Sequence, residues 1–158
     1  LSQIARDTLE RLNQQPMIRQ QQPEPGKQWP ARLLGAALIF AGIGHFTFSR
    51  QTFQAQVPTW LPLDPDFVVL ASGVVEITLG IALTSLGRHV ALVGLATALF
   101  FIAIFPGNIS QYLTHTDAFG LNTDEARLIR LFFQPLLVIW AIWSTDALSL
   151  LRKAKRHG

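Results

Sequence analysis

Apolar residues are concentrated in four long segments of the chain, and most polar residues lie outside them. The segments cover residues 29–48, 67–86, 90–105 and 128–143. A helix rises about 1.5 Å per residue, so about 20 apolar residues cross the hydrocarbon core of a bilayer. The first two segments have this length, and the last two need their flanking residues to complete a crossing. The pattern therefore predicts four membrane-spanning helices.

The composition favours the same fold class. Of the 158 residues, 49% are hydrophobic and 15% are charged, whereas average soluble domains carry roughly 25% charged residues. A soluble helical bundle is the alternative, but four such segments in a single-domain chain leave too little polar surface to cover them. We predict an all-α polytopic membrane protein, built as a four-transmembrane-helix bundle with an N-terminal amphipathic arm.

The chain divides into three regions. Residues 1–28 form the arm: apolar residues recur at helical spacing over 1–12, and 13–28 is a Gln- and Pro-rich tether. A helix with this spacing is typical of a segment that lies on a membrane or on a partner, while the tether has too little apolar material to fold alone. Residues 29–145 form the transmembrane domain, and 146–158 form a basic tail.

The basic residues predict the orientation, because Lys and Arg are enriched on the cytoplasmic side of membrane proteins. Ten of the 13 belong to one side: Arg6, Arg11, Arg19, Lys27, Arg32, Arg88, Arg152, Lys153, Lys155 and Arg156. Arg50, Arg127 and Arg130 belong to the other. We predict a multi-pass protein of the inner (plasma) membrane with both termini in the cytoplasm. The tail suits anionic lipid headgroups, and the pattern is not that of a nucleic-acid surface.

Five polar residues lie inside or at the edge of the apolar segments: His45, Glu76, Asn108, Arg130 and Gln134. A charged group near the bilayer centre costs roughly 2.5–3.5 kcal/mol on insertion scales. Glu76 is therefore expected to be protonated, to be paired with another group, or to face a water-filled cavity.

Helical spacing predicts that these residues share faces. The three sets are Ala37, Ala41 and His45; Ser72, Glu76 and Gly80; and Arg127, Arg130 and Gln134. Small residues in the first two sets allow close approach of helices, and an ion pair between Arg130 and Glu76 would offset much of the cost of both charges. Asn122 is the expected cap of the last helix, and Pro106-Gly107 is expected to break or kink the third.

Two interpretations remain open at this point. In one, the five polar residues are interhelical contacts that fix the packing of the bundle. In the other, they line a pocket open to the outer face and outer leaflet, since intramembrane ionisable groups commonly mark substrate or proton paths. There His45, Arg130 and Gln134 would donate hydrogen bonds to the bound molecule, Asn108 would sit at its rim, and Glu76 would be the catalytic residue that exchanges a proton.

Metal chemistry is not expected. One His and one Glu within the spans make too few ligands for a metal site. The chain has no cysteine, which excludes thiolate catalysis and thiolate metal centres. No covalently bound cofactor is predicted.

Several motifs resemble the DoxX-like branch of the DoxX family of small four-span membrane proteins. They are AGIGHF around His45, VPTWLP from Val57 to Pro62, SGVVEITLGIAL around Glu76, FPGN ending at Asn108, and RLIRLFFQP with Arg127, Arg130 and Gln134. Together they cover roughly residues 35–143, and Gly107 stands where the family commonly has Ala. The arm has no counterpart in the family pattern.

The resemblance implies a four-helix membrane fold and quinone-linked redox work alongside other membrane protein subunits. The leading hypothesis is a partner subunit of a membrane oxidoreductase system with a quinone- or lipid-sized pocket near the outer face. The alternative is a non-catalytic accessory subunit of a larger respiratory or photosynthetic complex, docked through residues 1–28. Transport of a small solute is a weaker hypothesis, because stand-alone transporters commonly carry duplicated broken helices.

Overall fold

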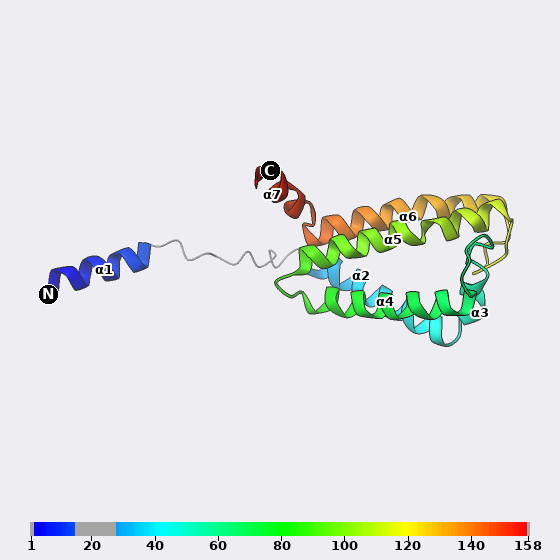
Figure 1. Ribbon diagram of the computed structural model, residues 1–158, viewed down its shortest axis with the longest axis horizontal. Helices are drawn as coiled ribbons and strands as arrows, with labels where there is room; N and C mark the ends of the chain where they lie inside the picture. The colour runs from blue at the N-terminus through cyan, green and yellow to red at the C-terminus, as the bar shows by residue number, and fades with distance from the viewer. Residues whose placement is uncertain (1, 15–27, 158) are drawn as a thin grey trace.

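The computed structural model describes residues 2–14 and 28–157, and the secondary structure in these ranges is entirely helical. The helices are α1 (Ser2–Gln14), α2 (Gln28–Phe46), α3 (Arg50–Gln54), α4 (Pro65–Ser85), α5 (Val90–Leu113), α6 (Asp124–Thr145) and α7 (Leu148–His157) (Figure 1). The all-α prediction is confirmed. The arm helix expected over 1–12 corresponds to α1, and most of the predicted tether lies outside the described residues.

Four of these helices, α2, α4, α5 and α6, are long and apolar enough to cross a membrane. The last two are longer than the apolar pattern indicated. α5 continues through Pro106 to Leu113. Of the break or kink expected at Pro106-Gly107, the break is therefore wrong, and the kink stays a prediction. Proline removes one backbone N–H from the helix, but side-chain hydrogen bonds of Asn108 and Gln111 to other elements hold the turns that follow it.

The helix ends follow from local sequence. Asp64 caps α4 by accepting a hydrogen bond from the Phe67 N–H, and Pro65 follows at the first helical position, where its missing N–H costs little. Thr123 caps α6 by accepting from the Ala126 N–H. The prediction of Asn122 as this cap is therefore wrong by one residue, because both residue types are good caps and spacing alone does not choose between them.

The bundle consists of two helix pairs, α2 with α4 and α5 with α6 (Figure 1). Glycines allow the first pair to approach closely. A Cβ atom on Gly35 would lie 2.7 Å from the Gly80 carbonyl oxygen, and one on Gly42 would lie 2.9 Å from the Gly73 carbonyl oxygen. The close approach expected from Ala37 and Ala41 is thus made by glycines on a neighbouring stripe of α2.

The two pairs meet through an apolar core near the end of the bundle opposite α3. Its buried members are Leu34, Leu38, Leu83, Ala98, Phe101 and Ala141. At the same end the Trp140 Nε1–H donates to the Pro30 carbonyl oxygen over 3.0 Å and ties α6 to α2. Towards α3 a cavity lies between the two pairs.

Candidate functional site

A cavity of about 640 Å³ lies between the two helix pairs in the half of the bundle nearer α3. All four long helices line it, together with α3 and the loops near that end. Its walls are largely apolar, and its volume is that of a site for a small organic molecule. The five polar residues selected from the sequence, His45, Glu76, Asn108, Arg130 and Gln134, all line it.

His45 and Glu76 face each other in this cavity. The His45 Nδ1 and Glu76 Oε2 atoms are 3.3 Å apart, and the two side chains are 5% and 8% exposed. The distance is that of an ion pair, yet the two groups are not aligned for a hydrogen bond, and both atoms lack any hydrogen-bond partner in the described chain. A buried polar atom left unpartnered costs about 1–3 kcal/mol. In native structures such atoms occur where a group has a redox or catalytic role, or where a water or ion completes its hydrogen bonds.

The other polar residues form a connected cluster on α5 and α6. The Asn108 Nδ2–H donates to Gln134 Oε1 over 3.2 Å, and the Gln134 Nε2–H donates to the Phe101 carbonyl oxygen over 2.7 Å. Arg130 Nη1–H also donates to Gln134 Oε1, over a longer 3.4 Å. Gln134 is thereby fixed by its neighbours, whereas the Arg130 guanidinium keeps further N–H groups for a bound molecule.

The expected ion pair between Arg130 and Glu76 is not formed. Among the residues that the structure describes, the basic side chain paired with Glu76 is His45. The reason lies in the helix pairing: α4 packs mainly against α2, so the carboxyl of Glu76 meets the end of α2. Arg130 instead turns towards Gln134, one turn along its own helix.

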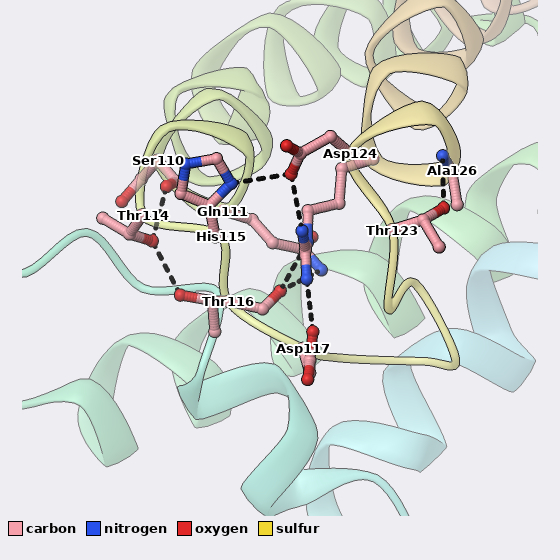
Figure 2. A network of polar contacts seen from close by, with 10 residues as sticks. Ser110, Gln111, Thr114, His115, Thr116, Asp117, Thr123, Asp124 and Ala126 are labelled. Carbon is pink, nitrogen blue, oxygen red and sulfur yellow. Dashed lines mark hydrogen bonds and ion pairs between the residues drawn. The ribbon is translucent and has the colours of Figure 1, made fainter.

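Arg127, on the same predicted face of α6, serves a different purpose. Its side chain is 5% exposed and donates to the Thr116 carbonyl oxygen, to Asp124 and to Asp117. Asp124 also contacts His115 Nδ1 at 2.6 Å. Figure 2 shows these groups gathered around the guanidinium. Arg127 therefore anchors the loop between α5 and α6 rather than lining the cavity.

A cap over the cavity was not predicted from the sequence. We use the name α3 cap for residues 50–61. The Arg50 Nε–H donates to Asp66 Oδ1 over 2.7 Å. Hydrogen bonding to Asp66 raises the pKa of the Arg50 guanidinium. The Gln56 Nε2–H donates to Gln111 Oε1 over 2.9 Å. The cap is thus joined to both helix pairs, and the polar partners that hold it are far apart in the sequence.

Aromatic rings lie where the cap meets the site. The Phe53 ring contacts the His45 ring edge-on with centroids 3.6 Å apart, and Phe119 contacts Phe53 at 4.8 Å. The His45 imidazole is therefore held between Glu76 and Phe53. In residues 2–14 and 28–157, no group of three or more His, Cys, Asp or Glu side chains could hold a metal ion.

Fold and site together define a small all-helical protein with four helices of membrane-spanning length around a partly polar cavity. Residues 34–145 match the family model of Domain of unknown function DUF8561. The match covers most of the chain, so the chain belongs to this family. The matched region contains all five polar residues of the cavity. No solved structure matches the chain.

Proposed function

We propose that the protein is a DoxX-like integral membrane protein whose cavity binds a quinone- or lipid-sized molecule as part of a membrane oxidoreductase system. One observation carries this proposal: a largely apolar cavity of about 640 Å³ contains two buried polar atoms without hydrogen-bond partners, on His45 and Glu76. Apolar walls with a few convergent polar groups are typical of sites for small organic ligands.

The distribution of basic residues supports an inner-membrane protein with cytoplasmic termini. Ten of the 13 Lys and Arg residues fall on the side of the termini. α7 adds four basic residues beside the exposed Leu148 and Leu151, and this combination favours contact with anionic lipid headgroups. In this orientation the α3 cap and the cavity belong to the outer half of the bilayer.

The side chains present suit a ligand with oxygen atoms on a ring. A quinone, when bound, would supply two-electron redox chemistry, with electrons exchanged with a partner subunit that carries a redox centre. Arg130 has N–H groups to donate to a carbonyl oxygen, and His45 offers Nδ1. The Glu76 carboxyl can hold or release a proton beside them. Gln134 and Asn108 hold this wall of the cavity in place.

The decisive experiment is purification of the tagged protein from native membranes in mild detergent, with its companions and lipids identified. We expect subunits with redox centres to copurify, and quinone-dependent turnover of that assembly to be lost with Glu76→Gln. The matched control is Glu125→Gln, which makes the same chemical change at an exposed position outside the cavity. Turnover that survives Glu76→Gln would refute the proton role, and purification without redox companions would refute the oxidoreductase partnership.

A second candidate function, a non-catalytic accessory subunit, is favoured by α1. Ile4 and Leu9 on this amphipathic helix are 73% and 63% exposed, so no residue of the described chain covers them. Deletion of residues 1–28 separates the two functions. Loss of complex association with quinone-dependent activity otherwise intact favours the accessory role, and unchanged association counts against it.

A further inference from the structure

The cavity reaches the sides of the bundle as well as the α3 cap. Two of its lining residues, Ala37 in the middle of α2 and Ala103 in α5, are exposed. Both belong to helices of membrane-spanning length and lie several residues from the helix ends. Openings at these positions would face hydrocarbon chains rather than water.

The opening at Ala37 is bounded on one side by contacts between α2 and α6. On one side of it, α2 and α6 are joined by the packing of Leu34 with Ala141 and by the hydrogen bond from Trp140 to Pro30. Further towards α3, the α2 edge consists of the small residues Ala37 and Ala41, which line the cavity. Small side chains at these positions leave the space between the helices open.

The opening at Ala103 lies on the side where α5 faces α4. Ala103 and Pro106 are exposed and line the cavity from α5, and Ser72 lines it from α4. Nearer α3 this side is covered, because a Cβ on Gly107 would lie only 2.9 Å from the Gln56 carbonyl oxygen. At this end the cavity is lined by the bulky side chains of Phe53, Trp60 and Phe119, with the rings of Phe53 and Phe119 edge-on.

The polar side chains that line the cavity indicate which head group its ligand would carry. The ionisable side chains that line the cavity are His45, Glu76 and Arg130, and its walls are otherwise largely apolar, so a charged head that lacks an ion-pair partner costs more to bury there than a hydroxyl. A hydroxyl both donates and accepts. It could donate to Glu76 Oε2 and accept from His45 Nδ1, the two atoms that have no hydrogen-bond partner among the described residues.

From these observations we infer that the ligand of the proposed function is a bilayer-resident amphipath with an uncharged, hydroxyl-bearing head. It enters sideways from the hydrocarbon region, and its chain leaves the cavity through one of the openings at Ala37 and Ala103. The ligand class is therefore a long-chain alcohol, phenol or quinol rather than a phospholipid or a water-soluble metabolite.

The test uses photoactivatable probes with the full chain in phosphatidylcholine vesicles. The probes are hexadecanol with a diazirine next to the hydroxyl, hexadecyl phosphate with the same group, and a short water-soluble diazirine alcohol. Cross-links are mapped by mass spectrometry and normalised to those on the lipid-facing Leu92 and Ile102, which are exposed. We expect hexadecanol to label the cavity about tenfold more than either other probe.

Variants that block the two openings provide the second part of the test. The double change Ala37→Trp and Ala103→Trp should lower cavity labelling by hexadecanol about tenfold, while Leu92→Trp, on the lipid-facing side of α5, should leave it unchanged. Equal labelling by the phosphate probe would overturn the uncharged head. Efficient labelling by the short alcohol that the Trp changes do not reduce would overturn access from the bilayer. Neither readout needs turnover or a partner, so the inference can fail while the oxidoreductase partnership stands.

Discussion

His45 and Gln134 line the same cavity, but their polar atoms are satisfied to different degrees. Gln134 shares hydrogen bonds with Asn108, Arg130 and a backbone carbonyl. Among the described residues, His45 Nδ1 and Glu76 Oε2 have no hydrogen-bond partner. The contacts of Gln134 fit the packing interpretation of the sequence, and the ligand-site interpretation is our proposal for His45 and Glu76.

This division predicts opposite effects on stability. Replacing His45 with Phe together with Glu76 with Leu should keep the free energy of unfolding within about 1 kcal/mol of the wild type, or raise it, because two apolar groups replace an unsatisfied buried pair. Gln134→Leu should lower it by about 1–3 kcal/mol, since Asn108 then loses its acceptor. Denaturant unfolding in micelles measures both. A large loss in the double variant would show that the pair holds the bundle together.

At the scale of the helix, glycine contacts set the distance between α2 and α4. A side chain at Gly42 would collide with Ile77 and with the backbone at Gly73, and one at Gly73 would meet the Cβ of His45. The position of His45 in the cavity therefore depends on glycines that carry no chemistry themselves.

We expect Gly73→Val to destabilise the protein by about 1–3 kcal/mol, the usual cost of overpacking. It should also displace His45 from Glu76. Gly87→Ala is the matched control, because nothing lies within 4 Å of a Cβ at Gly87. Thermal unfolding in nanodiscs compares the two. If Gly73→Val were as stable as the control, the close packing of α2 on α4 would be wrong.

The buried Arg127 guanidinium ties the loop between α5 and α6 to α6. Arg127→Gln removes the donors to Thr116, Asp117 and Asp124 (Figure 2). We expect faster amide hydrogen exchange across residues 114–123, with the long helices unaffected, because the guanidinium ties Thr116 and Asp117 of this loop to α6. Arg88→Gln, at an exposed position in the turn before α5, serves as control. Equal exchange rates in the two variants would contradict the anchoring role.

Sequence patterns were sufficient to predict that the four long helices exist, because each is a run of apolar residues. Their ends were less predictable: Thr123 rather than Asn122 caps α6, and α5 passes through Pro106. The five polar residues of the cavity could be selected because each interrupts an apolar span. The partner of Glu76 could not be predicted, since spacing along one helix does not determine which helix lies opposite.

At the scale of the whole molecule, the orientation is open to a direct test. The chain has no native cysteine, so single cysteines report topology cleanly. Asn122→Cys should react with a membrane-impermeant maleimide on intact cells, and Arg88→Cys should react only after permeabilisation. This follows from the excess of basic residues on the side of Arg88 and the termini. The reverse labelling pattern would invert the orientation and place the cavity in the cytoplasmic half of the bilayer.

The central claim is that the cavity between the helix pairs holds a ligand from the bilayer, and native mass spectrometry of the protein released from its own membranes tests it most directly. Ser72 lines the cavity, whereas Val74, two residues along the same helix, is exposed on its outside. We expect an amphipath bound to the wild type and to Val74→Trp, and lost from Ser72→Trp with the fold retained. Equal retention in both variants, or no bound molecule in the wild type, would contradict it.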